Sequence, residues 1–247
     1  INLPSVFVYT DYPAISTMGS QFADWRIKAG DYLAIGSGPA RALARKNKEL
    51  YEKIGYEDEA DVAVLVLETS KEPQDQVIEQ ISKDCKIAPE SLMLVLVPTT
   101  SVVGSTQVSG RIVETGLHKL MQLGLDPKLV LHAFGSAPIA PVHPRFVEAM
   151  GRTNDAILYA GVTNYDVFGC KDEELRDLVK KAPSSASKSY GKPFSEIFKE
   201  ANYDFYKIDP NLFAPAVLTI GNVETGNVFR AGKVNVEVFK RSIGLSA

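Results

Sequence analysis

Residues 61–97, DVAVLVLETSKEPQDQVIEQISKDCKIAPESLMLVLV, decide the fold class of this chain. The segments 61–68 and 92–97 are dense in valine and leucine, and the segment 73–85 between them has apolar residues at helical spacing. Segments that are apolar throughout are typical of strands covered on both faces or packed centrally. A buried strand, a helix and a second buried strand in succession predict an α/β architecture.

The next segment, 101–121, reads SVVGSTQVSGRIVETGLHKLM and is predicted to be one helix. Arg111 and Glu114 are three residues apart, so at helical spacing a guanidinium and a carboxylate share one face. Apolar residues fill most of the remaining circumference. An ion pair on a solvated face contributes only about 0.2–0.5 kcal/mol and needs no functional explanation. This segment alone leaves open whether the pair is structural or catalytic.

The other predicted elements extend the alternation of strands and helices along the chain. The segment 133–144, AFGSAPIAPVHP, is rich in proline and glycine and is predicted to be an ordered loop. We divide the chain into two α/β regions, 1–132 and 133–247, either of which can be discontinuous. The remaining predictions are strands at 6–9, 32–35 and 156–162, helices at 40–54, 144–150, 173–181 and 194–201, a hairpin of 216–221 with 228–231, and a closing helix from about residue 235.

Composition excludes several classes of protein. With 247 residues, 45% of them hydrophobic, the chain can bury one large core or two modest ones. A net charge of −3 without long runs of one sign argues against binding to nucleic acid or to an anionic membrane surface. The apolar runs are too short to span a bilayer. Cys85 and Cys170 lack CxxC spacing, which fits a reducing cytoplasm better than a disulfide framework.

A glycine loop is one candidate binding site. Gly36, Ser37 and Gly38 precede a predicted helix, so their backbone N–H groups could bind an anion, and Arg41 would add positive charge. The segment lacks the third glycine of a dinucleotide fingerprint and is not followed by the GK[ST] of a P-loop. Pro39 at a helix start also has a purely structural explanation, so both interpretations stay open.

The inventory of reactive side chains favours carboxylate chemistry. The three histidines show no metal-ligand spacing, and there is no GxSxG serine motif. Glu114 could act as a base on water while Arg111 offers donors to a developing oxyanion. Ser105 and Gln107 add polar groups just before this pair.

Several segments together resemble methenyltetrahydromethanopterin cyclohydrolase of archaea and some methylotrophic bacteria. The resemblance covers essentially the whole chain. The segments are IGSGPARALA at 35–44, YEKIGYEDEADVAV at 51–64, VVGSTQVSGRIVETGLHK at 102–119, APIAPVHP at 137–144, GRTNDAILYAG at 151–161, YGKPFSEIFKEANYDFYKIDPNLFAPA at 190–216 and AGKVNVEV at 231–238.

The resemblance implies a fold, a reaction and an assembly. The family consists of homotrimers of two α/β domains that bind the pterin in the cleft between them. Its members interconvert methenyltetrahydromethanopterin and the 5-formyl derivative with water, in methanogenesis and other one-carbon metabolism, without a metal or prosthetic group. The matching RxxE positions are Glu114, which would handle the proton of the attacking water, and Arg111, which would support it. Substrate contacts are expected from Gly36, Ser37, Gly38, Arg41, Ser105, Gln107 and Pro138.

Two departures from the family pattern matter. Family members extend tens of residues further at the amino terminus, so a preceding segment is expected to be missing from this chain. Val162 stands where related sequences often have arginine, which puts a substrate-tail contact there in doubt. The alternative function is a non-catalytic module that binds a pterin or a nucleotide.

Overall fold

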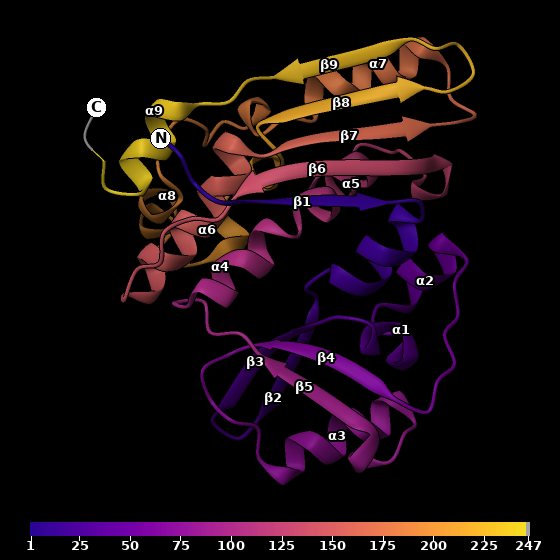
Figure 1. The fold of residues 1–247 in the computed structure, drawn as a ribbon, viewed down its shortest axis with the longest axis vertical. Coiled ribbons are helices and arrows are strands. Elements are labelled where there is room, and N and C mark those ends of the chain that lie inside the picture. The colour runs from indigo at the N-terminus through magenta and orange to yellow at the C-terminus, as the bar shows by residue number, and fades with distance from the viewer. Residues whose placement is uncertain (246–247) are drawn as a thin grey trace. The chain divides into compact units, whose positions relative to one another are not determined.

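The computed structural model describes residues 1–245, which form two compact units, each with its own sheet and helices (Figure 1). Unit 1 comprises Ile1–Pro13 and the chain from Thr100 onward, and unit 2 comprises Ala14–Thr99. The predicted α/β class is confirmed. The division differs from the predicted boundary at 132/133, which falls inside a strand of unit 1. Unit 1 is the discontinuous one, because the chain leaves it to build unit 2 and then returns.

Unit 2 contains a four-stranded sheet of order β2-β3-β4-β5. The predicted strand–helix–strand succession is confirmed, since β4 and β5 are parallel and joined by α3. Val77 and Ile81 of α3 belong to the same buried cluster as Leu65 and Leu67 of β4. Met93 and Val95 of β5 are exposed, so the expectation of cover on both faces is wrong there. The bounds are β2 Trp25–Ala29, β3 Tyr32–Ser37, β4 Ala63–Glu68, α3 Asp75–Cys85 and β5 Leu92–Leu96.

The helix predicted over 40–54 is two short helices, α1 (Ala40–Ala44) and α2 (Lys48–Ile54). Arg45 and Asn47 between them have φ of 47° and 64°, in the left-handed region that ends a helix. The Asn47 side chain then caps α2 by accepting a hydrogen bond from the Leu50 N–H at 3.3 Å. The helix-forming residues on both sides concealed this break from the sequence pattern.

Unit 1 contains a five-stranded sheet of order β1-β6-β7-β8-β9. Its strands pair antiparallel except for β7 and β8, and the predicted hairpin is confirmed as β8 and β9. Helix α5 contacts β6 and β7, whereas α7 contacts β8 and β9, and both helices lie behind the sheet in Figure 1. The bounds are β1 Ser5–Thr10, α5 Ile112–Gln122, β6 Val130–Pro138, β7 Val162–Val167, α7 Asp172–Lys181, β8 Val217–Asn222 and β9 Val228–Gly232.

Two predictions for unit 1 are wrong. The first half of the loop expected over 133–144 belongs to strand β6, which ends at Pro138, so that Pro141 and Pro144 lie outside the strand. The short helix at 144–150 and the strand at 156–162 are replaced by one helix, α6 (Phe146–Ala160). Residues 155–159 are all buried, and a buried helix gives the same continuous apolar run as a buried strand.

Helix α6 is the centre of the second hydrophobic core. It packs against α8 (Phe194–Glu200) and α9 (Val236–Ser242), both of which match predicted helices. Tyr159, Phe194 and Phe239 are buried in this cluster. Within residues 1–245, no helix has the length and apolar character that a membrane crossing requires.

Candidate active site

The helix predicted over 101–121 is interrupted in the middle. Helix α4 (Val102–Ser109) ends at Gly110, and α5 begins after Arg111. The Gly110 N–H donates to the Thr106 carbonyl at 2.9 Å, whereas the Arg111 N–H donates to the Val108 carbonyl at 3.0 Å, so the spacing tightens from four residues to three. Glycine favours such a break because it is a poor helix former. Arg111 is therefore the N-cap of α5 and not a residue inside one long helix.

Glu114 occupies the third position of α5 and is only 6% exposed. Arg111, three residues earlier, is half-buried. The alternative of an ion pair on a solvated face is therefore wrong for Glu114. The partial positive charge at a helix N-terminus favours a carboxylate at this position. A buried carboxylate with an arginine in the same turn is a typical arrangement for proton transfer.

The same helix carries a buried lysine that sequence reasoning missed. Lys119 is 1% exposed, and its Nζ donates to Asn211 Oδ1 at 2.5 Å. Burial lowers the pKa of Lys119, and the charge of Asp209 partly opposes this shift. On a helical wheel Lys119 falls within the apolar arc of α5. The position of a lysine within this apolar arc is the sequence feature that could have identified Lys119 as a buried charge.

Helix α4 places two of the predicted substrate residues. The Ser105 hydroxyl is buried and donates to the Ala140 carbonyl at 2.6 Å, and Ser109 donates to the Pro138 carbonyl at 2.8 Å. These bonds fasten α4 to the end of β6, which gives Ser105 a structural role. Gln107 differs, because its Nε2 is buried and has no hydrogen-bond partner among the described residues. A buried amide without a partner is costly, so this N–H group is available to a carbonyl of a ligand.

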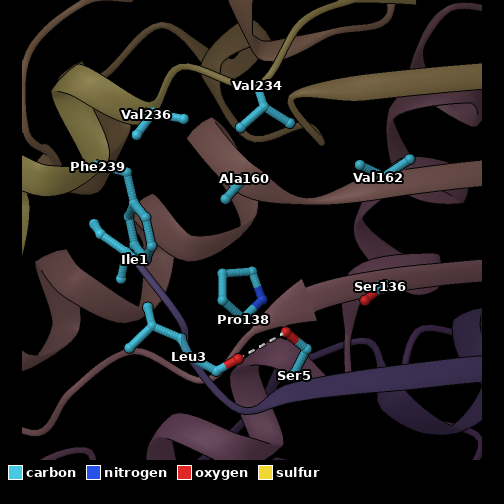
Figure 2. Close-up of a pocket in the computed structure, with 10 residues that line it drawn as sticks. All are labelled: Ile1, Leu3, Ser5, Ser136, Pro138, Ala160, Val162, Val234, Val236 and Phe239. Atoms are coloured by element: carbon cyan, nitrogen blue, oxygen red, sulfur yellow. Dashed lines mark hydrogen bonds between the residues drawn. The ribbon is translucent and has the colours of Figure 1, made fainter.

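Pro138 lines a pocket of about 330 Å³ in unit 1 (Figure 2). Most of the lining side chains are aliphatic, and Phe239 contributes an aromatic ring. The Ser5 hydroxyl, one of the few polar groups there, donates to the Leu3 carbonyl at 3.5 Å. The predicted contact of Pro138 with a ligand is thus compatible with an apolar part of that ligand. The lining residues are Ile1, Leu3, Ser5, Ser136, Pro138, Ala160, Val162, Val234, Val236 and Phe239.

The predicted glycine loop lies in unit 2 and is largely strand. Gly36 and Ser37 belong to β3, where Gly36 pairs with Trp25 and Leu67 of the adjacent strands. Gly38 has φ of +114°, and its N–H donates to the Ser20 carbonyl at 2.7 Å. The Gly38 N–H is therefore engaged within the protein, and the glycine is explained by its backbone conformation.

Arg41 is completely buried in unit 2. Its Nη1 donates to the carbonyls of Met18 and Gly19 at 3.0 and 2.9 Å, and its Nε donates to Asp24 at 3.0 Å. The guanidinium also lies over the ring of Phe22. These contacts tie α1 to the π-helix η1 (Ala14–Gln21) and neutralise the charge. Substrate contacts by Arg41 and by the glycine loop stay predictions.

The histidines whose partners are described serve local contacts. His132 Nδ1 lies 2.9 Å from Asp11 Oδ1, and His143 Nδ1 accepts from the Arg145 N–H at 3.1 Å. Within residues 1–245, no three His, Cys, Asp or Glu side chains form a group that could hold a metal ion. The expectation of a metal-free site stays a prediction.

Comparison with known proteins agrees with the resemblance. The profile of the family described as Cyclohydrolase (MCH) matches residues 1–243. Methenyltetrahydromethanopterin cyclohydrolase of Methanothermobacter marburgensis is 52% identical over 98% of this chain and 76% of that protein. The enzymes of the same name from Methanocaldococcus jannaschii and Methanosarcina barkeri are 53% and 48% identical over 99% and 98% of this chain, again covering 76% of each relative. Similarity over nearly the whole length shows that this chain belongs to the methenyltetrahydromethanopterin cyclohydrolase family.

Proposed function

We propose that this chain interconverts 5,10-methenyltetrahydromethanopterin plus water with 5-formyltetrahydromethanopterin, as a hydrolase acting on the C–N bond of a cyclic amidine in one-carbon metabolism. The observation that carries the proposal is the identity of 52–53% over 98–99% of the chain to enzymes named for this reaction. The buried carboxylate of Glu114 gives the chain a group suited to the chemistry.

The substrate is already a strong electrophile, so the protein needs to supply only a weak base. The methenyl carbon already shares a positive charge with two nitrogens, so water adds to it readily once its proton is accepted. Glu114 accepts that proton as the C–O bond forms. The bond from this carbon to one nitrogen then breaks, the nitrogen takes up a proton, and the hydroxyl loses its own to become the formyl oxygen. One proton is released overall, and we propose that no metal or prosthetic group takes part.

The neighbouring residues have supporting roles in this proposal. Arg111 places a positive charge in the same turn as Glu114 and offers N–H donors to the oxygen of the adduct. Gln107 directs its unpaired amide N–H toward a carbonyl of the pterin ring. Ser105 does not contact the substrate in this proposal; it holds α4 in place by donating a hydrogen bond to the Ala140 carbonyl.

The disappearance of the methenyl absorbance tests the function directly. Purified chain should accelerate the hydrolysis of methenyltetrahydromethanopterin well above its spontaneous rate in the same buffer. A decay at the spontaneous rate would remove the enzyme assignment. Calorimetric titration with the same compound would then identify a non-catalytic pterin-binding module, the alternative function.

Arg111→Lys is expected to lower kcat by about tenfold or more, because lysine keeps the charge but loses the planar fork of N–H donors. The chain contains a matched control in the second RxxE segment, 145–148. Arg145 is the N-cap of α6 as Arg111 is of α5, but it is largely exposed and pairs with Glu148 at 3.3 Å. Arg145→Lys should leave kcat unchanged. Equal kinetics for the two variants would assign Arg111 a purely structural role.

We also propose that the chain assembles as a homotrimer and works in the cytoplasm. Both cysteines, Cys85 and Cys170, are free thiols, which agrees with a reducing compartment. Light scattering on the eluting protein should give three times the chain mass of 26.9 kDa. A mass of one or two chains at micromolar concentration would exclude the trimer.

A further inference from the structure

The proposed function depends on where α5 holds Glu114, and we infer that Tyr165 is the positioning residue that sets the place of this carboxylate. Tyr165 lies in β7, the central strand of the five-stranded sheet, and pairs with Ala133 and Ile220 on the neighbouring strands. Its side chain is completely buried on the face that α5 covers. A residue held in the middle of a sheet is a rigid reference point for the helix packed on it.

The Tyr165 hydroxyl is bonded into the first turn of α5. It donates to the Val113 carbonyl at 2.8 Å, and Val113 immediately precedes Glu114. In a regular helix this carbonyl would accept only from the Leu117 N–H. The tyrosine hydroxyl therefore contacts the backbone ladder of the helix at this carbonyl. Burial raises the pKa of Tyr165 and Thr163 opposes this shift, while the charge of Glu114 raises the pKa further, so the two side chains share one electrostatic environment.

Gly116 provides the space that this contact needs. A Cβ on Gly116 would lie 2.1 Å from the Tyr165 hydroxyl oxygen and 3.1 Å from Cγ of Pro215. A side chain at this position would push α5 away from β7 or expel the hydroxyl. The glycine and the tyrosine together therefore fix how closely the first turn of α5 approaches the sheet.

A second buried tyrosine in unit 1 shows what is particular to Tyr165. Tyr159 is equally buried, and its hydroxyl donates to the Lys192 carbonyl at 2.6 Å. The two hydroxyls make the same kind of bond to a backbone carbonyl. They differ in the acceptor, because only that of Tyr165 adjoins Glu114. Loss of the Tyr165 or the Tyr159 hydroxyl should lower stability by a similar amount, but only the loss at Tyr165 should displace Glu114.

The consequence for catalysis follows from the geometry of proton transfer. A general base must come within about 2.6–3.2 Å of the proton's parent atom. A displacement of about 1 Å can cost roughly 100-fold in rate. If the first turn of α5 moves by less than this, the loss of rate should be smaller. Substrate binding relies on other groups, so the effect should appear in kcat and not in KM.

The test compares Tyr165→Phe with Tyr159→Phe. We expect Tyr165→Phe to lower kcat about tenfold with KM changed less than about twofold, whereas Tyr159→Phe keeps the kcat of the parent chain. The melting temperatures of both variants show whether the two substitutions lower stability by the same amount. Gly116→Ala should also lower kcat, but in the Tyr165→Phe background it should cost less, because the clash with the hydroxyl is gone.

Two results would overturn the inference. One is a kcat for Tyr165→Phe equal to that for Tyr159→Phe at similar loss of melting temperature, and the other is full additivity of Gly116→Ala with Tyr165→Phe. Because the inference rests on the proposed function, the unmodified chain is assayed first. An inactive parent chain defeats both the function and the inference, whereas an active parent with an unaffected Tyr165→Phe variant defeats the inference alone.

Discussion

Glu114→Gln is expected to lower kcat by about 10²- to 10⁴-fold while the affinity for the pterin stays nearly the same, which is the range that general bases contribute. Glutamine keeps the shape and the hydrogen-bonding length of the side chain but cannot take up a proton from water. The site is only 6% exposed, so solvent does not readily replace the lost base. Stopped-flow absorbance for kcat, and calorimetry for binding, separate the two effects.

Glu148→Gln is the matched control for this variant. Glu148 is the third residue of α6 and follows Arg145 at the same spacing as Glu114 follows Arg111. It pairs with Arg145 and with Lys199 at 3.2 Å, as a glutamate near the surface does. Its replacement should leave kcat unchanged. A Glu114→Gln variant that turns over as fast as Glu148→Gln would refute the role of Glu114.

The two RxxE segments show how far the sequence alone can lead. RIVE at 111–114 and RFVE at 145–148 have the same charges, the same spacing and the same position at a helix start. Local pattern cannot distinguish them. What distinguishes them is burial, which is produced by the sheet beneath α5 and is therefore a property of the tertiary structure. In the sequence, only the chain-wide resemblance selected the first segment.

The fold was predictable where local signals agree with the tertiary structure. Strands β4 and β5, helix α3 and the β8–β9 hairpin follow from dense valine and leucine, helical spacing and a turn rich in polar residues and glycine. Prediction failed where packing decided between two local possibilities. The run at 156–160 belongs to a helix because α8 and α9 cover it, and 133–138 forms a strand because β1 and β7 pair with it.

The candidate site shows the same division. Arg111, Glu114 and Gln107 lie close in sequence on the α4–α5 segment, so a motif could point to them. Tyr165 is 52 residues away from the Val113 carbonyl that it contacts. Such a contact forms only when β7 and α5 pack together, so no local sequence pattern predicts it. Long-range positioning of this kind is what the structure adds.

Asp155 is the second residue for which a large effect is expected, in stability and not in turnover. Its carboxyl group is fully buried in α6, where both oxygens accept from the Phe194 N–H at 3.0 Å and one accepts from the Ser242 hydroxyl at 2.5 Å. It therefore connects α6 to α8 and α9. Burial, with a smaller contribution from the charge of Glu196, raises the pKa of Asp155 to about 8, although the bonds from Ser242 and Phe194 oppose the shift.

The direction of the pH effect follows from this raised pKa. The folded state holds the Asp155 proton more tightly than the unfolded state, in which the pKa is near 3.8. The contribution to stability is therefore complete below about pH 4 and is lost as the pH rises toward 8. Asp155→Asn removes the titration while its amide can still accept from Phe194 and donate to Ser242. The free energy of unfolding of the variant relative to the parent should rise by about 1 kcal/mol per pH unit up to pH 8 and then level off.

Urea unfolding of both proteins from pH 5 to 9 measures this difference, and Asp172→Asn provides a control of opposite sign. Hydrogen bonds from Asn227, Thr225 and Asn222 lower the pKa of Asp172, so its contribution is lost only as the pH falls below about 4. The Asp172→Asn difference should therefore stay flat from pH 5 to 9. A flat profile for Asp155→Asn over the same range would mean that Asp155 is ionised in the folded protein. The bonds from Phe194 and Ser242 would then outweigh the cost of burying its charge.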